Sequence, residues 1–223
     1  MKLSFTEENY LKAIYGLWDG KGLGVNTNSI AEKLNTKASS VTDMIKKLSD
    51  KKLVNYEKYQ GVGLTKEGKK IAVDTIRKHR LWEVFLVEKL KFGWDEVHEI
   101  AEQLEHIQSI KLIDSLDAFL NHPRFDPHGD PIPDKNGKFA SRSESFLLSD
   151  AQVGDRLIVT GVSDTSSAFL IYLDQNNLVL GTQFKLLEMF EFDRSVRIEL
   201  KDKKQLTLSN VVTRNMLVRK KIK

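Results

Sequence analysis

The chain of 223 residues contains no cysteine, only four prolines and no long run of apolar residues. Without cysteine it forms no disulfide, no thiolate zinc site and no cysteine nucleophile. No segment approaches the roughly 18 apolar residues that cross a bilayer, and the N-terminal residues lack the apolar core of a signal peptide. We therefore expect a protein of the reducing cytoplasm that has no membrane partner.

The composition is that of a folded chain, with 40% hydrophobic and 30% charged residues. At roughly 150 residues per domain, the length suggests one or two domains, or three small ones. Residues 1–72 carry 13 basic and 8 acidic residues, residues 73–141 carry 9 and 13, and residues 142–223 carry 13 and 10. A basic first segment suits a polyanionic partner, and an acidic middle segment that contains histidines suits a cation.

The first 50 residues show the pattern of a helix-turn-helix. Apolar residues recur at helical spacing over residues 7–18, and Thr6 is the expected N-cap. A Gly-rich turn leads to a short helix at residues 27–34, and a third helix is expected over residues 39–48. A short helix, a tight turn and a third helix with a polar outer face are typical of helix-turn-helix proteins.

The next segment predicts a β-hairpin wing. Residues 53–59 alternate as a strand, a turn is expected at residues 61–63, and the chain returns through Leu64 and Thr65. A long helix is then expected through about Leu90. The first domain thus has the pattern of a winged helix-turn-helix, with a small helical domain that binds no nucleic acid as the alternative.

The expected DNA interface combines lysines with small polar residues. Lysines contact phosphates and fix the position of a protein on DNA, whereas small polar side chains near a helix start contact base edges. The candidates are Thr27, Lys37, Ser39, Ser40, Thr42, Asp43, Lys46, Lys47 and Lys58. Two roles remain open for Asp43, because a carboxylate accepts a hydrogen bond from a cytosine amine but repels phosphate.

Histidine and glutamate gather on two expected helices of the acidic segment. The first pair, His79 and Glu83, is spaced i, i+4. The second set is spaced i, i+4, i+7 and i+8 and consists of His98, Glu102, Glu105 and His106. On one continuous helix the second set falls within an arc of about 100°. A solvated helix face is the alternative for any single pair. The whole set favours a site for a borderline or hard divalent ion such as Mn²⁺, Fe²⁺ or Zn²⁺.

The remaining chain, from about Ser145, predicts a small antiparallel β-barrel. It contains short alternating segments that are separated by turns at residues 154–155 and 174–177. The expected strands are residues 151–159, 169–173, 179–181, 185–188, 195–200 and 205–208.

These segments together resemble the diphtheria-toxin-repressor family of metal-dependent transcriptional repressors, and especially its manganese-responsive members. The resemblance rests on the motifs EENYLKAIYGL, SSVTDMIKKLSDKKLV, YEKYQGVGLTKEGKKIA, RKHRLWEVFL and VHEIAEQLEHI, on His122-Pro123, and on the loop PHGDPIP. It covers residues 5–140 almost continuously. It implies an α+β fold with a winged helix-turn-helix domain at residues 1–72, a helical metal-binding and dimerisation domain at residues 73–141, and an SH3-like (FeoA-type) β-barrel at residues 145–223.

The resemblance also implies two metal sites. The family's primary site corresponds here to Asn9, Glu102, Glu105 and His106. Its ancillary site corresponds to His79, Glu83 and His98, with Asp164 of the barrel as a further candidate. Glu102 stands where iron-type relatives have a sulfur ligand, which favours Mn²⁺ over Fe²⁺, while Zn²⁺ and other divalent ions are expected to bind in vitro. Manganese-type relatives usually have aspartate at the position of Asn9, so Glu8 or a water is an alternative ligand there.

The implied function is repression rather than catalysis. Metal would act as a co-repressor that enables a homodimer to bind palindromic double-stranded operators of metal uptake genes, and no small organic substrate is expected. Two alternatives remain open: a metal-independent winged-helix regulator that senses another ligand, and a metalloenzyme with Glu102 or Glu105 as general base. The sequence contains no separate nucleophile motif and no Gly-rich phosphate loop, which argues against the enzyme.

Overall fold

The structure, a computed structural model, describes residues 3–18, 24–57, 61–141 and 144–221. The chain divides into two compact units, which we call the first unit and the second unit. The first unit contains residues 1–82, 101–119 and 132–139, and the second contains residues 83–100, 120–131 and 140–223. Among the described helices, none is both long and apolar enough to cross a membrane.

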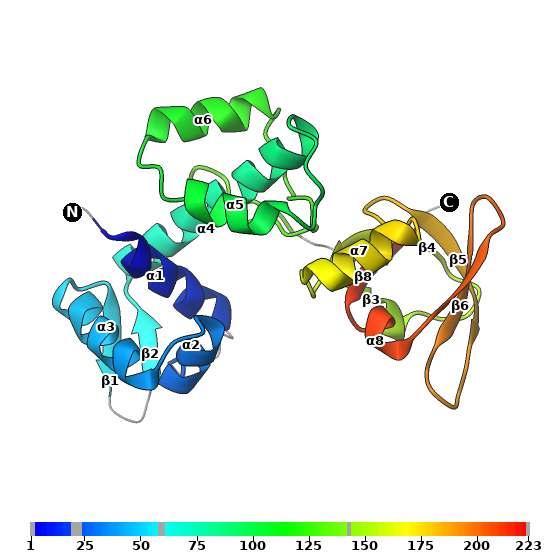
Figure 1. Ribbon diagram of the computed structural model, residues 1–223, viewed down its shortest axis with the longest axis horizontal. Coiled ribbons are helices and arrows are strands. Elements are labelled where there is room, and N and C mark those ends of the chain that lie inside the picture. Colours follow the sequence, from blue (N-terminus) through cyan, green and yellow to red (C-terminus); the bar gives the residue numbers. More distant parts are fainter. Residues whose placement is uncertain (1–2, 19–23, 58–60, 142–143, 222–223) are drawn as a thin grey trace. The chain divides into compact units, whose positions relative to one another are not determined.

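Three helices and a two-stranded hairpin form the first part of the first unit (Figure 1). They are α1 (Phe5–Leu17), α2 (Thr27–Lys33), α3 (Ala38–Asp50), β1 (Val54–Glu57) and β2 (Gly61–Leu64). Their apolar faces share one buried core that includes Leu11, Ile30, Ile45 and Leu48. The predicted order of helix, helix-turn-helix and hairpin is confirmed.

The start of α1 differs from the prediction. Ser4, and not Thr6, is the N-cap: its hydroxyl accepts a hydrogen bond from the backbone N–H of Glu7, and the Glu7 carboxylate accepts one from the backbone N–H of Ser4. This reciprocal pair is a capping box, which satisfies two helix-terminal donors at once. A Ser with Glu three residues later therefore outcompetes an isolated Thr as the helix start.

The wing also differs in detail from the prediction. Residues 61–63 belong to β2 rather than to a turn. Val25 pairs with Val62, and a Cβ atom on Gly61 would lie 2.5 Å from the carbonyl carbon of Gly24. Gly61 has a φ of +88°, which a glycine adopts without strain. The glycine is thus needed for close approach of two backbones, and not for chain reversal.

Three further helices follow, α4 (Lys66–Glu88), α5 (Val97–Leu104) and α6 (Ile110–Phe119). The long helix of the prediction is confirmed, although α4 ends at Glu88 rather than about Leu90. The prediction that four metal-ligand candidates share one helix was wrong, because α5 ends at Leu104 and both Glu105 and His106 follow it. The boundary between the two units falls within both α4 and α5.

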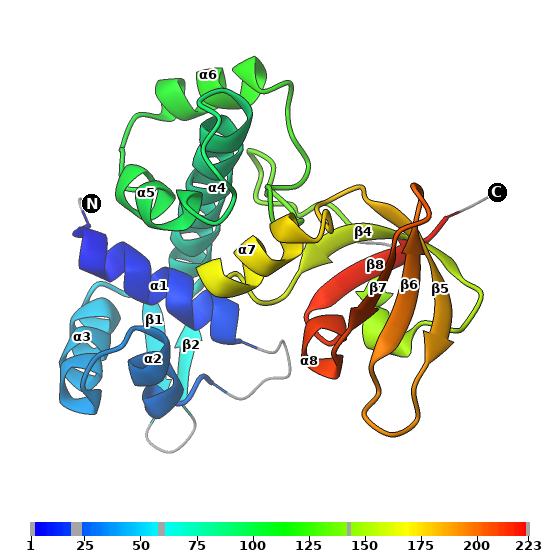
Figure 2. The ribbon, with the colours of Figure 1, turned by 45° about the vertical axis from the view of Figure 1, so that its right-hand side comes forward.

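The second unit contains a six-stranded antiparallel sheet in the order β3-β8-β4-β5-β6-β7 (Figure 2). Its strands are β3 (Phe146–Leu147), β4 (Arg156–Val162), β5 (Gln183–Met189), β6 (Val196–Leu200), β7 (Gln205–Leu208) and β8 (Met216–Lys220). The same part of the chain also contains a 3-10 helix, η1 (Leu148–Asp150), and the helices α7 (Ser167–Gln175) and α8 (Asn210–Thr213). The predicted α+β class, helical first and β-rich last, is confirmed.

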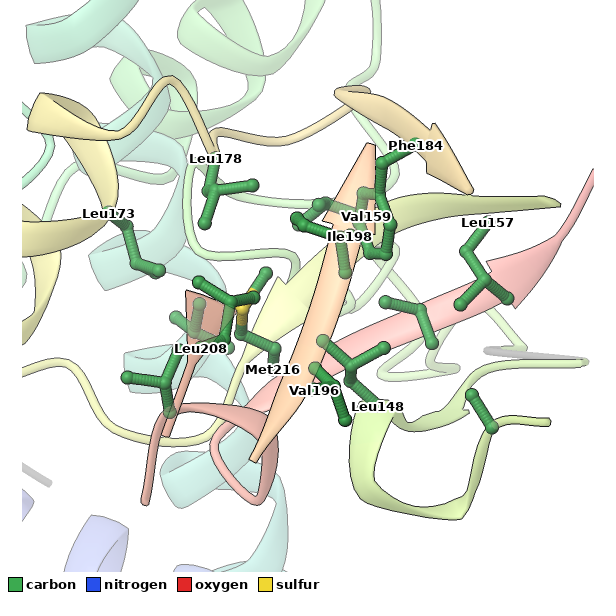
Figure 3. Packing of buried hydrophobic residues seen from close by; sticks show 14 of the residues in the cluster. Leu148, Leu157, Val159, Leu173, Leu178, Phe184, Val196, Ile198, Leu208 and Met216 are labelled. Atoms are coloured by element: carbon green, nitrogen blue, oxygen red, sulfur yellow. The ribbon is translucent and has the colours of Figure 1, made fainter. Parts of the chain in front are cut away.

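The core of the second unit is one cluster of buried apolar side chains from the strands, η1, α7 and α8. Side chains of Leu157, Val159 and Ile198 from the strands and of Leu173 from α7 are buried in one cluster (Figure 3). Burial of aliphatic side chains of this size stabilises a fold by about 1.5–3 kcal/mol each. This cluster therefore supplies the main stabilisation of the sheet.

Two predicted strands of this unit were wrong. Residues 169–173 lie in the helix α7, and residues 179–181 form a turn rather than a strand. Leu170 and Leu173 are both buried at i, i+3 spacing, which is the periodicity of a helix face. A short apolar run does not distinguish a buried strand from a buried helix by pattern alone.

Candidate metal centre and nucleic-acid interface

Glu105 is the centre of a buried polar cluster in the first unit. Its side chain is 0% exposed, and its backbone N–H continues the helical pattern by donating to the carbonyl of Ala101 (2.8 Å). The Nζ of Lys12 on α1 lies 2.6 Å from Oε1 and 2.8 Å from Oε2 of Glu105. The Nδ1 of His79 on α4 lies 2.6 Å from Oε2. One carboxylate thus receives an ammonium and an imidazole from two different helices.

These contacts keep Glu105 ionised. Burial raises the pKa of a carboxyl group, but here the hydrogen bond with His79 and the charge of Lys12 outweigh it and lower the pKa of Glu105. A buried carboxylate that is held ionised is suited to bind a cation.

His106 follows Glu105 directly and is oriented by α1. Its Nδ1 lies 2.6 Å from Oε2 of Glu8, whose Oε1 accepts a hydrogen bond from the side chain of Gln108 (2.6 Å). The ring stacks on Phe5 at a centroid distance of 4.4 Å. With Nδ1 turned to Glu8, Nε2 lies 3.9 Å from Oε1 of Glu105. A carboxylate on one imidazole nitrogen commonly orients the other nitrogen toward a metal.

Asn9 and Glu102, the other two residues of the predicted primary set, lie on α1 and α5 and differ in exposure. Within the described part of the chain, the buried Oδ1 of Asn9 has no hydrogen-bond partner. Such an orphaned acceptor calls for a cationic or donor partner. Oε1 of Glu102 lies 3.6 Å from Nζ of Lys12, and the Glu102 side chain is 46% exposed. Oxygen, nitrogen and carboxylate donors of this kind fit a divalent ion.

The predicted ancillary residues lie on both sides of the unit boundary. On α4, His79 precedes Glu83 by one helical turn and contacts Glu105 of the predicted primary set. In the second unit, Nδ1 of His98 lies 3.4 Å from Oε1 of Glu83. Asp164 instead accepts a hydrogen bond from the backbone N–H of Ser166 (2.8 Å), ahead of the first turn of α7.

Sequence reasoning missed two residues that the structure places beside Glu83. Glu83, Asp126 and His128 are buried, and each offers one ligand atom within 4.8 Å of the others. Burial lowers the pKa of His128, but contacts with Glu83 and the charge of Asp126 outweigh it, so the pKa is raised. Both residues lie in or next to the PHGDPIP loop, which helical spacing does not connect to α4. The loop motif was the only signal available in the sequence.

The predicted DNA-contacting residues lie mostly on the exposed side of α3. Ser39, Ser40 and Lys46 are exposed, and Lys46 lies 3.7 Å from Asp43. Thr42 is half-buried and donates its hydroxyl hydrogen to the carbonyl of Ala38 (3.0 Å). Thr27, the first residue of α2, is also half-buried, while Lys37 is exposed as the residue before α3. Lys58 lies outside the described residues.

Lys47 faces both solvent and α1. Its Nζ lies 3.2 Å from Oε1 of Glu7, which also accepts a hydrogen bond from Lys51 (2.6 Å). Burial opposes ionisation of Glu7, but the hydrogen bonds from Lys51, Ser4 and Lys47 prevail and lower its pKa to about 2. The start of α1, next to Glu8 and Asn9, is therefore tied by charge to the end of α3.

Comparisons with known proteins agree with this arrangement. Residues 2–62 match the family described as "Iron dependent repressor, N-terminal DNA binding domain", and residues 65–134 match "Iron dependent repressor, metal binding and dimerisation domain". Residues 146–220 match the FeoA domain. The HTH-type transcriptional regulator MntR of Oceanobacillus iheyensis is 36% identical over 115 residues, which are 52% of this chain and 77% of that protein. The chain belongs to the iron-dependent repressor family.

Other members of the iron-dependent repressor family support the same relationship. The iron-dependent repressor IdeR of Mycobacterium tuberculosis is 34% identical over 128 residues, which are 57% of this chain and 55% of that protein. The matched part thus spans about half the length of this relative. A solved manganese-dependent transcriptional repressor in complex with manganese is 32% identical, with a TM-score of 0.86, over 96% of this chain and 100% of that one. The manganese regulator SloR is 36% identical, with a TM-score of 0.73, over 96% of this chain and 98% of its own.

The family is one of transcriptional repressors and not of enzymes. The FeoA match at residues 146–220 covers the β-rich C-terminal part of the fold. The metalloenzyme alternative is therefore not supported.

Proposed function

We propose that this chain is a metal-dependent transcriptional repressor in which a divalent ion, held by Asn9, Glu102, Glu105 and His106, acts as co-repressor. The observation that carries the proposal is the buried cluster at Glu105, where Nε2 of His106 lies 3.9 Å from Oε1 of Glu105. The orphaned Oδ1 of Asn9 supplies a further oxygen donor from α1. A bound ion would join α1 of the DNA-binding part to the residues that follow α5, and so hold α1 in one position.

The position of Lys12 supports the proposed metal site, because its ammonium group already contacts the carboxylates there. Its Nζ contacts both oxygens of Glu105 and lies 3.6 Å from Glu102. A lysine ammonium and a divalent ion at the same carboxylates repel each other, so we infer that Lys12 withdraws when metal binds. Lys12 also disfavours a second ion beside the first.

We propose Mn²⁺ as the favoured ion and Fe²⁺ as the alternative. The donor set contains carboxylate, amide oxygen and imidazole, and no sulfur ligand comes from cysteine. The relatives whose structures name a metal contain manganese, cadmium or zinc. We propose in addition that His79, Glu83 and His98 form an ancillary site, for which the 3.4 Å approach of His98 to Glu83 is the support. Asp164 stays a prediction for that site.

The DNA-binding surface that we propose is the exposed side of α3 together with the wing. Small polar side chains such as Ser39 and Ser40 would contact bases, and Lys46 would contact phosphate. The remaining proposed contacts are Thr27, Lys37, Thr42, Asp43, Lys47 and Lys58. The target is palindromic operator DNA of metal uptake genes, which places the protein in the cytoplasm.

We propose a homodimer as the active species. The matched family segment at residues 65–134 is described as a dimerisation domain. Within it, α6 exposes large apolar side chains, with Ile110 81% and Phe119 60% exposed. Exposed apolar groups of this size are typical of interaction surfaces. In this proposal, residues 1–72 bind DNA. Residues 73–141 bind metal and form the dimer, and residues 145–223 form the FeoA-type domain.

Selection of bound fragments from a DNA library tests the proposal. The full chain is incubated with the library in parallel with Mn²⁺ and with a chelator. We expect enrichment of a two-fold-symmetric motif with Mn²⁺ only, with half-sites one helical turn or a multiple of it apart. Equal enrichment with chelator would instead support a metal-independent regulator, and no enrichment in either arm would contradict DNA binding.

A further inference from the structure

We propose that the sheet face of the second unit that points away from its core binds the phosphate backbone of double-stranded DNA. The residues that carry the proposal lie on β4, on β5 and at the end of β8. We call them the basic face, and they are Arg156, Lys185, Arg219 and Lys221. The inference rests on the proposed function, because it takes DNA as the partner of the chain. It adds a second DNA contact outside the helix-turn-helix.

Three residues of the basic face form a row across neighbouring strands. β8, β4 and β5 follow one another in the sheet (Figure 2). On β4, Arg156 is the cross-strand partner of Lys185 on β5. On its other side, the backbone carbonyl of Arg156 accepts a hydrogen bond from the N–H of Lys221 (2.8 Å), directly after β8. Because neighbouring strands lie about 4.8 Å apart, the row carries one basic residue about every 5 Å.

The alternation of side chains along β4 places this row on the side of the sheet away from the core. Leu157 and Val159 are buried in the core of the second unit. The residues before and between them, Arg156 and Ile158, therefore belong to the opposite face. Ile158 pairs with Arg219 on β8, which brings a fourth basic residue to that face. Arg219 is half-buried, and the three residues of the row are exposed.

Within the described part of the chain, no ion pair neutralises the basic face. The acidic neighbour of the row is Glu199 on β6, the cross-strand partner of Lys185. Its carboxylate lies 3.1 Å from Nζ of Lys203 instead. The carboxylate of Asp155, next to the row on β4, lies 2.9 Å from Nζ of Lys220. The nearby carboxylates thus serve lysines outside the basic face.

The row of like charges does not stabilise the sheet. Like charges at directly opposite positions of neighbouring strands are destabilising. Arg156 has such a neighbour on each side, Lys185 on β5 and Lys221 after β8. A polyanion that lies along the row would remove this repulsion. The closely spaced phosphates of duplex DNA supply such a line of negative charge.

The composition of the basic face favours DNA over an acidic protein as the partner. Lysine and arginine contact phosphates without reading the bases. The centre of a protein interface is instead depleted in lysine and enriched in aromatic residues, which the basic face lacks. Residues 2–62 of the same chain match a DNA-binding domain. We therefore expect the basic face to strengthen binding to operator DNA and to unrelated DNA alike.

The test compares two charge-matched triple variants of the full chain. Glutamine replaces three residues in each, so both variants lose three positive charges. The basic-face variant is Arg156→Gln/Lys185→Gln/Arg219→Gln. The control replaces three exposed residues of the second unit outside the basic face, Arg194→Gln/Lys201→Gln/Arg214→Gln. Fluorescence anisotropy with Mn²⁺ at several salt concentrations gives the affinity for the selected operator and for a duplex of unrelated sequence.

We expect the basic-face variant to bind both duplexes at least ~10-fold more weakly than the unchanged chain, because each lost phosphate contact reduces the slope of log K against log salt by about 0.9. Three lost contacts reduce it by about 2–3 per chain. The control variant should stay within about twofold, since salt screens charges that do not contact DNA. In thermal melting the basic-face variant should be no less stable than the unchanged chain, because repulsion in the row is removed. A purely structural role would lower the melting temperature and leave the slope unchanged.

Photo-crosslinking gives a second measurement that does not depend on affinity. The chain contains no cysteine, so Lys185→Cys provides a single attachment point for an aryl azide. After illumination with Mn²⁺ and operator present, we expect a covalent adduct between this variant and DNA. Arg194→Cys, between β5 and β6, is the control and should give none.

Three results would overturn the proposal. Equal losses of affinity and slope in both triple variants would show a general effect of net charge. A basic-face variant that binds fluorescent polyglutamate more weakly, but DNA as tightly as the unchanged chain, would assign the face to an acidic protein. An unchanged slope together with no DNA adduct from Lys185→Cys would place DNA away from the face.

The same experiments separate this inference from the proposed function. If the basic-face variant retains full metal-dependent operator binding, the repressor function holds and only the assignment of the basic face is wrong. If the unchanged chain binds neither duplex with Mn²⁺, the proposed function fails, and the basic face fails with it.

Discussion

At the scale of single residues, Lys12 would compete with metal at the proposed site around Glu105. Its Nζ lies within hydrogen-bonding distance of both Glu105 oxygens and is 3.6 Å from Glu102. Hydrogen bonds between charged groups contribute about 1.5–3 kcal/mol each to stability. An ion that binds at the proposed site would have to replace these contacts, so we expect Lys12 to lower its affinity.

Lys12→Met should therefore bind Mn²⁺ about tenfold more tightly than the unchanged chain, since the competing ammonium is gone. Isothermal titration calorimetry with Mn²⁺ measures this difference. Lys33→Met, at an exposed position of α2, is the matched control and should leave the affinity as it is. Weaker binding by Lys12→Met would show that Lys12 supports the site instead of competing with metal.

A single ion pair in the second unit sets part of its acid stability. The Lys220 ammonium lies 2.9 Å from Asp155 Oδ1, and together with a hydrogen bond from the backbone N–H of Gln152 it holds the pKa of Asp155 below its usual value. A carboxyl group whose pKa is lowered by folding contributes stability above its unfolded pKa of 3.8. That contribution is lost as the pH falls through the lower folded pKa.

Asp155→Asn should lower the stability of the second unit at pH 6 by up to about 1 kcal/mol, a value limited by solvent screening of a pair near the surface. The difference from the unchanged chain should shrink toward pH 3. Urea unfolding at the two pH values, followed by β-sheet circular dichroism, measures it. An equal difference at both pH values would contradict the assignment of the lowered pKa to this ion pair.

At the scale of elements, the loop of residues 120–131 depends on a glycine. Gly129 combines a positive φ with a backbone contact to Thr160, so two separate penalties apply to a side chain there. Gly154 has a φ of +95°, but a Cβ atom added to it meets nothing within 4 Å. Substitutions at the two glycines therefore distinguish backbone strain alone from backbone strain combined with a steric clash.

Gly129→Ala should destabilise the second unit by more than Gly154→Ala, which should cost about 1 kcal/mol from its φ alone. Gly129→Ala must in addition move the loop away from β4, which adds to the loss of stability. Thermal melting compares the two variants. Equal melting temperatures for both variants would show that the loop does not need the close contact.

Elements with a long periodic pattern were predictable from the sequence. The apolar spacing in α1 and the alternation in β5, β6 and β7 indicated the correct structures, because each pattern matches one periodicity over several turns or residues. The prediction for the segment of α7 failed, since the short apolar run at residues 168–173 fits both a strand and a helix. The end of α5 failed too, because nothing in its spacing indicates that the helix ends before Glu105.

The candidate site was also predictable from the sequence only in part. The pairing of His106 with Glu105 follows from neighbouring positions, so the sequence indicated it. The contact of Lys12 with Glu105 joins residues 93 positions apart, and only packing of α1 against the α5 end produces it. Asp126 and His128 were missed for the same reason, since a loop has no periodicity that relates it to Glu83.

At the scale of the whole molecule, the proposed switch predicts how salt affects DNA binding. Lys46 is exposed on α3, and its partner Asp43 is 81% exposed, so their ion pair is weak. A lysine that contacts a phosphate releases about one counterion on binding.

Lys46→Ala should weaken binding to all DNA sequences alike and should reduce the slope of log K against log salt by about 0.9 per dimer half. Fluorescence anisotropy at several salt concentrations, with Mn²⁺ present, gives the slope. Lys33→Ala, on α2, is the control. An unchanged slope would place Lys46 away from the DNA backbone.

The most direct test of the account is the operator affinity of the full chain measured with Mn²⁺ and with chelator, in parallel for the unchanged chain and for Glu105→Gln. The operator is the motif enriched by DNA selection, and fluorescence anisotropy gives each affinity. We predict that Mn²⁺ strengthens binding at least tenfold in the unchanged chain, and that Glu105→Gln removes this gain while remaining folded. A metal response that persists in Glu105→Gln would contradict the central claim that the ion acts through the cluster at Glu105.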